Sequence, residues 1–377
     1  MSTIVISGGA GFIGSRLVQK LHDRGDRIIV LDLFSPQIHG ENYIESSLYK
    51  SIKGKCEILQ SDVRIREAWE SALRDADTVV HLAAETGTGQ SMYQVSHYAS
   101  VNIQGTALLL DILMNSKVTV KKIVIASSRA IYGEGAYICR EHGIQLPSGR
   151  YDADMRRGVF DPLCPRCRQP MSPCATTEDV ILKPNSVYGI TKMTQEQLVL
   201  LFGRTTGMPT IALRYQNVYG PGQSLKNPYT GILSIFSTVM LNNNDIDIFE
   251  DGLETRDFVY IDDAIDATIR AIESKAVICE AINVGSGIPT TVLQVAETLK
   301  NKYKSTSRIE ISGHYRLGDI RHNFADLSRA RSILGYEPKI NFDDGINRFA
   351  EWVKHQKIAE DNYKKSLLEL TQKGLLK

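Results

Sequence analysis

The chain has 377 residues, of which 42% are hydrophobic, enough to bury a large core in one or two domains. Lys and Arg number 44 against 43 Asp and Glu, so the net charge provides no attraction to nucleic acid or to an anionic membrane. No apolar run approaches the ~20 residues that span a bilayer, and the first predicted strand begins too close to Met1 to leave room for a signal segment. We therefore expect a cytoplasmic protein with neither nucleic-acid nor membrane partners, whose cysteines are reduced thiols or metal ligands.

The first predicted element is a β-branched strand at residues 4–7 that runs into a glycine-rich turn. Gly8, Gly11 and Gly14 allow the backbone to turn tightly, to approach a pyrophosphate closely and to let the next helix pack on the sheet. That helix, predicted at residues 15–23, points its N-terminal N–H groups and the positive end of its dipole at the pyrophosphate. The pattern is typical of a dinucleotide site, although glycine turns also occur where no ligand binds.

A second buried strand, predicted at residues 27–31, ends at Asp32, eighteen residues after Gly14. This spacing is close to that at which an acidic side chain accepts hydrogen bonds from the adenosine ribose hydroxyls of a dinucleotide. A carboxylate would also repel a 2′-phosphate, so the sequence favours NAD over NADP. The alternative is an aspartate that only caps a turn in an ordinary doubly wound sheet.

Apolar runs and helical patterns then alternate along the chain up to about residue 219. The alternation predicts an α/β fold of the Rossmann type, a doubly wound parallel sheet with helices on both faces. Further strands are predicted at residues 56–60, 78–83, 122–127 and 210–215, and helices at residues 65–73, 98–116 and 188–206.

The same pattern predicts the domain organisation. An NAD-binding Rossmann domain is expected at residues 1–219, followed by a smaller substrate-binding α/β lobe at residues 220–350 that interleaves with it. The lobe, with a strand at 247–249 and a helix at 292–302, is expected to cover the carboxyl edge of the sheet, where ligands bind in such folds. Residues 351–377 are expected to form a charged amphipathic helical tail, which carries no catalytic signature.

Tyr188 and Lys192 are four residues apart on a predicted helix, which places their Cβ atoms about 5–6 Å apart on one face. A nearby ammonium, together with the positive nicotinamide ring of NAD+, would lower the pKa of the tyrosine from about 10 and let the phenolate take a proton from a sugar hydroxyl. A Tyr/Lys pair at this spacing is also common on helix surfaces. Ser128, which ends a buried strand and can hydrogen-bond the reacting oxygen, favours the catalytic interpretation.

With these motifs in this order, residues 1–350 resemble the extended short-chain dehydrogenase/reductase family, and within it the sugar-nucleotide epimerases and dehydratases. The resemblance implies that the catalytic residues are Ser128, Tyr188 and Lys192. The cofactor contacts that it implies are Gly8, Gly11, Phe12, Ile13, Gly14, Asp32, Asp62, Val63, Leu82, Ala83, Ala84, Asn102, Tyr188 and Lys192. The substrate contacts that it implies are Thr86, Gln90, Ser91, Ser128, Arg129, Asn217, Arg256, Arg316 and Arg321.

The implied substrate is a nucleotide-diphospho sugar. Arg256, Arg316 and Arg321 are expected at its diphosphate, because each guanidinium offers paired N–H donors to anionic oxygens. Gln90 and Ser91 lie in a loop expected to face the sugar ring and to select it.

The residues after Ser128 indicate which reaction of the family is expected. Dehydratases carry an Asp-Glu pair there, whereas this chain has Arg129 and Ala130. Without that pair, the expected reaction is a reversible oxidation of the sugar at carbon 4. If the NAD stays tightly bound, this oxidation and the return of the hydride give 4-epimerisation through a 4-keto sugar. The alternatives are a UDP-hexose 4-epimerase and a nucleotide-sugar 4-ketoreductase or dehydrogenase. A regulatory protein that only binds NAD would not need the catalytic trio.

An insertion at about residues 135–184 is rich in Pro, Gly, Arg and Cys and has no long periodic element. It resembles an insertion of bacterial dTDP-L-rhamnose 4-epimerases, which make dTDP-6-deoxy-L-talose. The resemblance implies a dTDP-6-deoxyhexose as substrate.

The insertion also carries two short pairs of candidate metal ligands, separated by 21 residues. Such pairs resemble those of a zinc ribbon, where four side chains close a tetrahedron around a structural ion. The candidate ligands are Cys139, His142, Cys164 and Cys167, with Cys174 as a spare thiol that can replace the histidine. A metal-free remnant of an ancestral site would look the same in the sequence.

The family resemblance also implies a homodimer. In relatives, the helices equivalent to those predicted at residues 98–116 and 188–206 pair across a two-fold axis, and two-fold dimers are the commonest closed oligomers. The alternative is that these helices pack only within one chain.

Overall fold

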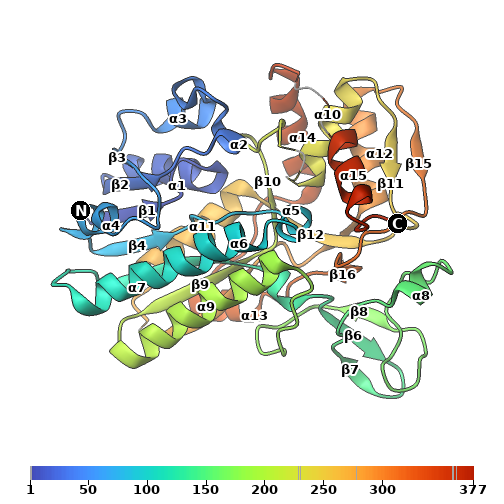
Figure 1. Cartoon of the computed structure of the whole chain (residues 1–377), viewed down its shortest axis with the longest axis horizontal. Helices are drawn as coiled ribbons and strands as arrows, with labels where there is room; N and C mark the ends of the chain where they lie inside the picture. The colour runs from blue at the N-terminus through green and yellow to red at the C-terminus, as the bar shows by residue number, and fades with distance from the viewer. Residues whose placement is uncertain (1, 228, 230, 277, 359–360, 362) are drawn as a thin grey trace.

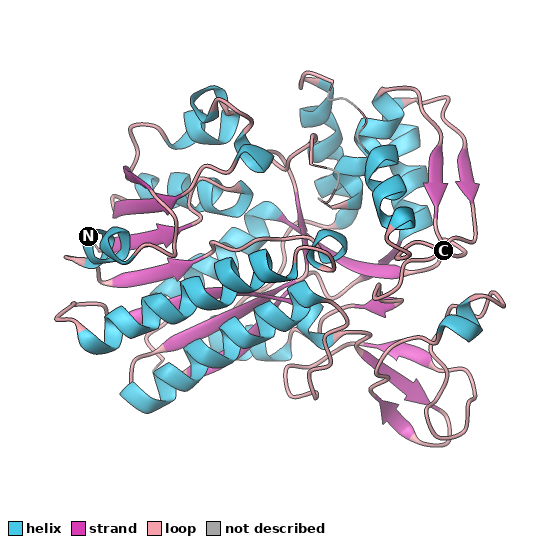
Figure 2. Cartoon of the chain, in the orientation of Figure 1, coloured by secondary structure: helices cyan, strands magenta, loops and turns pink. Residues whose placement is uncertain are grey.

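A seven-stranded parallel sheet forms the centre of the chain, in the strand order β13-β9-β5-β4-β1-β2-β3. The computed structural model describes residues 2–227, 229, 231–276, 278–358, 361 and 363–377. The strands are β1 Thr3–Ser7, β2 Arg27–Asp32, β3 Glu57–Gln60, β4 Thr78–His81, β5 Lys122–Ser128, β9 Thr210–Tyr215 and β13 Cys279–Val284. Both faces of the sheet are covered by helices (Figures 1 and 2), so its strands are continuous apolar runs.

Two hydrophobic cores lie on opposite faces of this sheet. On one face α1 and α11 pack through residues such as Leu17 and Ile265, and on the other α4, α7 and α9 pack through residues such as Trp69, Leu109 and Val199. These helices are α1 Phe12–Asp23, α4 Arg66–Leu73, α7 Gly105–Asn115, α9 Val187–Thr206 and α11 Ile261–Glu273. The predicted doubly wound α/β fold is therefore confirmed.

The helix predicted at residues 98–116 differs from the structure in its first half. A π-helical segment, Ala99–Gln104, precedes the α-helical turns of α7. Its wider turn carries Asn102, whose buried side chain bonds the backbone of a neighbouring loop. Such π-helical segments are frequent at functional sites.

A second lobe extends from one end of the sheet, at the upper right of Figure 1. It contains two small sheets, in which β10 and β14 flank β12, β16 also pairs with β12, and β11 pairs with β15. Because β13 returns to the main sheet beside β9, the two parts of the chain interleave. The lobe comprises β10 Asn217–Tyr219, α10 Ile232–Leu241, β11 Ile246–Ile248, β12 Thr255–Tyr260, β14 Pro289–Thr291, α12 Val292–Tyr303, β15 Ile309–Ile311, β16 His322–Asn323 and α14 Phe342–Lys354.

The C-terminal tail is not the single helix that its charge pattern predicts. α14 ends at Lys354, a separate helix α15 spans Tyr363–Gln372, and the last residues are extended. Gly374, at φ +68°, turns the chain so that Leu375 and Lys377 pair with the backbone of Leu317 and Tyr315. Residues 359, 360 and 362 of the predicted helix lie outside the described residues.

The insertion folds into a three-stranded antiparallel sheet in the order β7-β6-β8, which projects at the lower right of Figure 1. Its elements are β6 Ala136–Cys139, β7 Gly143–Gln145, α8 Asp152–Met155 and β8 Ser172–Cys174. The remaining short helices of the chain are α2 Pro36–His39, α3 Ser47–Ile52, α5 Thr88–Ser91, α6 Val95–Tyr98 and α13 Ser328–Leu334, with single 3-10 turns at Tyr43–Glu45 and Arg129–Tyr132.

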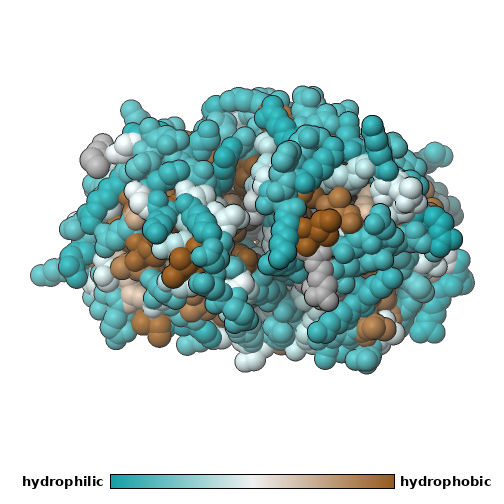
Figure 3. All heavy atoms as spheres, turned by 90° about the horizontal axis from the view of Figure 1, so that it is seen from above, coloured by the Kyte–Doolittle hydropathy of each residue, from teal (hydrophilic) through white to brown (hydrophobic). Residues whose placement is uncertain are grey.

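The face of the molecule seen in Figure 3 is mainly hydrophilic, with scattered hydrophobic groups. In the described part of the chain, no helix combines the length and the apolar character needed to cross a bilayer.

Candidate active site

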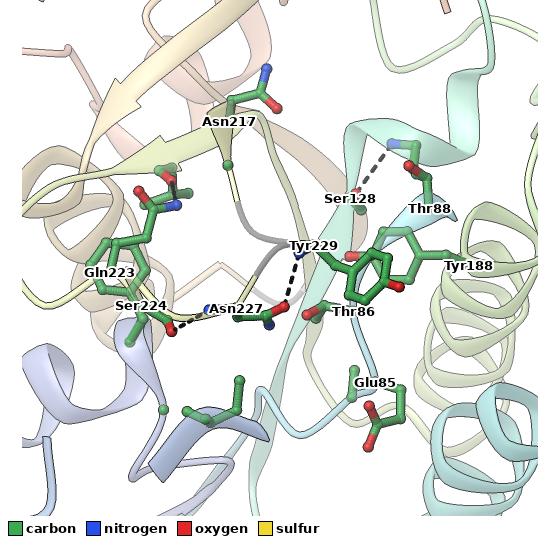
Figure 4. Close-up of a pocket in the computed structure, with 18 of the residues that line it drawn as sticks. Glu85, Thr86, Thr88, Ser128, Tyr188, Asn217, Gln223, Ser224, Asn227 and Tyr229 are labelled. Atoms are coloured by element: carbon green, nitrogen blue, oxygen red, sulfur yellow. Dashed lines mark hydrogen bonds between the residues drawn. The ribbon is translucent and has the colours of Figure 1, made fainter. Parts of the chain in front are cut away.

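A cavity of about 590 Å³ lies where the carboxyl ends of the main-sheet strands face the second lobe. This is where ligands bind in open α/β sheets. Residues from the ends of β1, β2, β4 and β5 form one wall, and residues of α10, β12 and α15 form another. Figure 4 shows part of the lining.

The glycine-rich turn at residues 8–14 leaves a hollow in the cavity wall, here called the glycine cradle. A side chain at Gly8 or Gly14 would collide with the neighbouring backbone. Gly8 has φ +70°, and a Cβ on it would lie 2.7 Å from the backbone nitrogen of Ala83. A Cβ on Gly14 would collide with the carbonyl oxygen of Gly8, so the first turn of α1 packs directly on the glycine turn. The turn therefore leaves backbone N–H groups close to the cavity, which fits the pyrophosphate of a dinucleotide.

Asp32 ends β2 at the cavity wall, as predicted. Its two carboxylate oxygens accept hydrogen bonds from the backbone N–H groups of Ala10, at 2.9 Å, and Phe34, at 2.8 Å. Burial raises the pKa of Asp32, and these hydrogen bonds act against that rise. Each oxygen keeps a further lone pair, which fits the ribose hydroxyls of NAD.

Most of the other predicted cofactor residues also line the cavity, but Asn102 does not. Its Oδ1 accepts the backbone N–H of Glu85 at 2.7 Å, and its Nδ2 donates to Thr191 Oγ1 at 2.9 Å. Asn102 thus connects the loop after β4 to α9. It holds these two parts of the site in place without lining the cavity itself. The cavity-lining members of the set are Gly8, Gly11, Phe12, Ile13, Gly14, Asp32, Asp62, Val63, Leu82, Ala83, Ala84, Tyr188 and Lys192.

The three predicted catalytic residues come together at the cavity. Figure 4 shows Tyr188 reaching from α9 toward Ser128 at the end of β5, and Lys192 lines the cavity one helical turn further along α9. The Oγ of Ser186 caps this helix by accepting the N–H of Gly189 at 3.1 Å. The end of β5 therefore holds Ser128 in place, and the capped helix α9 holds Tyr188 and Lys192.

The ionisation of Tyr188 differs from the prediction. Burial raises its pKa, while a hydrogen bond with Ser128 and the guanidinium of Arg129 act against the rise. Lys192, the predicted cause of a lowered pKa, donates instead to Gln195 Oε1 at 2.8 Å, and burial lowers its own pKa to about 7. The prediction missed that both side chains lose their water in this position.

The predicted sugar-selecting residues Gln90 and Ser91 lie behind the cavity wall. Ser91 Oγ accepts the backbone N–H of Tyr188 at 3.0 Å, so this side chain positions the catalytic helix. Gln90 is buried and accepts a hydrogen bond from Gln37 Nε2 at 3.1 Å. Of the predicted residues in this loop, Thr86 lines the cavity.

Arg129 and Asn217 meet at the cavity wall. Arg129 Nε donates to Asn217 Oδ1 at 3.1 Å, and burial, with a contribution from Arg256, lowers the pKa of Arg129 to about 10. Among the described residues, the buried Nδ2 of Asn217 has no hydrogen-bond partner. It is therefore a free donor for a polar ligand.

Arg256 and Arg316 share one carboxylate at the cavity wall. Their Nη2 atoms lie 3.2 Å and 2.7 Å from the two oxygens of Asp319. Burial raises the pKa of Asp319, but the guanidiniums outweigh that effect and hold it well below its usual range. In the described structure the buried Nε of Arg316 has no partner, so this arginine has donor capacity left for an anion.

Arg321 is not brought to the cavity, in contrast to the expectation. Its side chain is 1% exposed and is bound by Asp161 at 2.7 Å, Glu250 at 2.9 Å and Asp251 at 2.7 Å. Its backbone carbonyl accepts a hydrogen bond from Arg256 Nη1 at 3.0 Å. Arg321 therefore positions Arg256 from within the lobe.

The structure adds cavity residues that the sequence did not reveal. They come from the loop after β10 and from α15, and Tyr229 joins the two by donating to Glu369 Oε2 at 2.8 Å. The amphipathic pattern of the tail was a signal for a docked helix, but it did not indicate the surface that the helix covers. The added lining residues include Gln223, Ser224, Asn227, Tyr229, Tyr363, Ser366, Leu367 and Leu370.

Comparison with known proteins agrees with this geometry. Residues 4–153 and 165–285 match the model of the NAD dependent epimerase/dehydratase family. A dTDP-L-rhamnose 4-epimerase of Burkholderia thailandensis is 37% identical over 94% of this chain and 95% of its own length. A putative UDP-glucose 4-epimerase of Methanocaldococcus jannaschii is 30% identical over 93% of this chain and 98% of its own length.

Solved structures show the same fold. UDP-glucuronic acid 4-epimerase from Bacillus cereus, in complex with UDP-glucuronic acid and NAD, has a TM-score of 0.76 at 26% identity, covering 93% of this chain and 99% of its own. UDP-glucose 4-epimerase from Thermotoga maritima, with UDP-glucose, has a TM-score of 0.74 at 28% identity, covering 93% and 98%. The chain thus belongs to the NAD-dependent epimerase/dehydratase family.

Proposed function

We propose that this chain is an NAD-dependent nucleotide-sugar 4-epimerase that interconverts dTDP-L-rhamnose and dTDP-6-deoxy-L-talose through a 4-keto sugar. The observation that carries the proposal is the meeting of Ser128, Tyr188 and Lys192 in one cavity with a glycine cradle on one side and Arg256 and Arg316 on the other.

NAD is the cofactor that fits the cradle and Asp32, and when bound it takes a hydride from carbon 4 of the sugar and returns it. The four side chains of the insertion that could hold a metal ion lie outside this chemistry, because none of them lines the cavity.

Tyr188 is the acid/base of the reaction. Its phenolic oxygen takes the proton of the carbon 4 hydroxyl as the hydride leaves, and Ser128 hydrogen-bonds the same sugar oxygen. The hydrogen bond with Ser128 and the positive charge of Arg129 favour the phenolate form. The 4-keto sugar then rotates in the cavity, so that the opposite face of carbon 4 can receive the hydride. Tyr188 gives the proton back to the oxygen on carbon 4.

The diphosphate anchors the substrate while the sugar turns. Arg256 and Arg316, which share Asp319 in this structure, present guanidinium donors to phosphate oxygens. Asn217 offers its free Nδ2 to the sugar side.

Replacing Arg316 by methionine is expected to raise KM for the nucleotide sugar roughly 10- to 100-fold, with a smaller effect on kcat, because a hydrogen bond to a charged group contributes about 1.5–3 kcal/mol. Steady-state kinetics measure the effect. Arg308→Met is the matched control, since Arg308 is 73% exposed in the same lobe and pairs with Asp245. An unchanged KM in Arg316→Met would remove this arginine from substrate binding.

The sugar and the base are supported by the Burkholderia relative, a dTDP-L-rhamnose 4-epimerase similar over nearly the full length. The Methanocaldococcus relative is a putative UDP-glucose 4-epimerase and the Thermotoga structure is a UDP-glucose 4-epimerase, so a UDP-hexose 4-epimerase is the second candidate. Incubating the protein with dTDP-L-rhamnose, UDP-glucose and UDP-glucuronic acid, with products analysed by NMR, separates the two. Conversion of UDP-glucose alone would favour the second candidate, and stoichiometric NADH would indicate a dehydrogenase.

We expect the chain to form a homodimer through α7 and α9, which lie side by side in Figure 1. Exposed apolar side chains on these helices include Met114, Ile190 and Leu201. Sedimentation at micromolar concentration should give twice the chain mass, and Leu201→Glu should shift it toward the monomer. Ile311→Glu, an exposed site on β15, should leave the dimer intact. A wild-type monomer would contradict the expectation.

A further inference from the structure

Four side chains of the insertion meet outside the active-site cavity. One ligand atom from each of Cys139, His142, Cys164 and Cys167 lies within 4.8 Å of all the others. They come from two turns, one between β6 and β7 and the other in the loop before β8. None of the cysteines forms a disulfide.

Three of the six distances between these atoms match the edges of a tetrahedron around zinc. Bond lengths of about 2.3 Å to sulfur and about 2.0–2.1 Å to nitrogen give tetrahedral edges of about 3.8 Å between two sulfurs and about 3.6 Å between sulfur and nitrogen. In the structure, the sulfurs of Cys139 and Cys167 are 3.7 Å apart, and His142 Nδ1 lies 3.6 Å and 3.7 Å from the sulfurs of Cys139 and Cys164.

We infer that Cys139, His142, Cys164 and Cys167 hold one structural zinc ion, and that this ion fixes the position of the loop that carries Arg316 and Asp319. Four protein ligands leave no open coordination position, which is typical of a structural rather than a catalytic zinc site. Cys174 is not among the four. It lies on β8, opposite Ala136 of β6, so the spare thiol of the sequence pattern stays outside the cluster.

The insertion needs such an ion because its own core is small. Its buried hydrophobic residues form two small clusters, one of which joins Met155 and Phe160 to Tyr315 outside the insertion. The other consists of Tyr137, Cys139, Cys164 and Met171, with Cys167 packed against it. Two of these four are themselves ligands. Small modules with so little buried apolar area usually rely on a metal or disulfides for their stability.

Hydrogen bonds and an ion pair connect the insertion and the adjoining Glu134 to the substrate-side loop, residues 316–321. Arg150 bonds Glu134 at 3.2 Å and donates to the backbone carbonyl of Asp319 at 3.1 Å. Glu134 accepts the backbone N–H of Arg321 at 2.7 Å, and Asp161 binds the Arg321 side chain. A loosened insertion therefore frees the loop between Arg316 and Arg321, and that consequence for the substrate rests on the proposed function.

The direct test is the metal content of the full chain purified without chelator. We expect about one zinc per chain in the wild type and in Cys174→Ser, and less than a tenth of that in Cys139→Ser and Cys164→Ser. A zinc-free wild type, or equal loss of zinc in Cys174→Ser, would overturn the site.

Because a serine variant can misfold, the wild type grown with Co²⁺ in place of zinc gives a second measurement. Visible absorption bands of tetrahedral cobalt with a thiolate charge-transfer band are expected, and their absence overturns the proposal. Neither metal content nor cobalt spectra depend on the substrate, so they test the site even where the proposed reaction fails.

Removal of the ion from the wild type by a chelator tests the effect on the loop. Limited proteolysis is expected to cut within residues 135–184 at least tenfold faster, and KM for the nucleotide sugar should rise several-fold while kcat changes less. Restoration of both values by added Zn²⁺ supports the inference. A metal-free protein with unchanged proteolysis and unchanged KM would overturn it.

Discussion

Replacing Tyr188 by phenylalanine is expected to lower the turnover number at least ~10²-fold, the scale typical of losing a positioned acid/base. The change removes one oxygen from a side chain that shares the cavity with Ser128 and Lys192, and the half-buried ring should keep its position on α9. The thermal midpoint and the circular dichroism spectrum should therefore stay close to those of the wild type. Steady-state turnover of the nucleotide sugar measures the effect.

Tyr303→Phe is the matched control for this variant. Its hydroxyl hydrogen-bonds Ser237 at 2.8 Å within the second lobe and does not line the cavity. Loss of that hydroxyl should leave turnover within a factor of two or so of the wild type, because nothing at the reacting carbon changes. A Tyr188→Phe enzyme with a near-normal rate would exclude Tyr188 from the chemistry.

Replacing Glu196 by glutamine should lower the free energy of unfolding by about 3–5 kcal/mol, the range for breaking a buried ion pair by removing one charge. Glu196 and Arg214 are 2% and 5% exposed and form two hydrogen bonds, at 2.6 Å and 3.0 Å. Ser127 also donates to Glu196, at 2.6 Å. The variant leaves the Arg214 guanidinium buried without its counter-charge beside the catalytic strand.

Chemical denaturation measures this loss, and Glu351→Gln provides the comparison. Glu351 pairs with Lys354 at 2.6 Å on the surface of α14, where an ion pair contributes about 0–1 kcal/mol. Equal, small effects of the two substitutions would show that the buried pair does not hold α9 against the sheet.

The parts of the fold that repeat a simple pattern could be predicted from the sequence. The strand predicted at residues 122–127 is β5, Lys122–Ser128, because a strand buried on both faces is a continuous apolar run. Parallel strands end at one edge of the sheet, so Gly8, Asp32 and Ser128 had to lie near one another once the fold was known.

Residues whose role depends on distant partners could not be assigned in this way. Arg316 and Arg321 are five residues apart and look alike in the sequence, but only Arg321 is enclosed by carboxylates from Asp161, Glu250 and Asp251. Ser91 has the residue type of a sugar contact, yet it holds the backbone of Tyr188. Tertiary packing decides which partners a side chain contacts. A local sequence pattern carries no information about that packing.

For the four candidate metal ligands of the insertion, the sequence predicted part of the arrangement and missed the rest. Their spacing in the sequence identified the four side chains that meet in the structure, because each pair lies in a tight turn and the turns face each other across a small sheet. The sequence did not indicate the hydrogen bond of Arg150 to the Asp319 carbonyl or the ion pair of Asp161 with Arg321, which connect this module to the substrate-side loop.

The central claim is that this chain inverts carbon 4 of a nucleotide sugar by removing a hydride and returning it to the same carbon. The most direct measurement uses dTDP-L-rhamnose carrying deuterium at carbon 4, incubated with the purified protein without added NAD, with the product analysed by NMR. We predict dTDP-6-deoxy-L-talose that retains the deuterium at carbon 4. Loss of the deuterium to solvent during conversion, or release of deuterated NADH with accumulation of a 4-keto sugar, would contradict the claim.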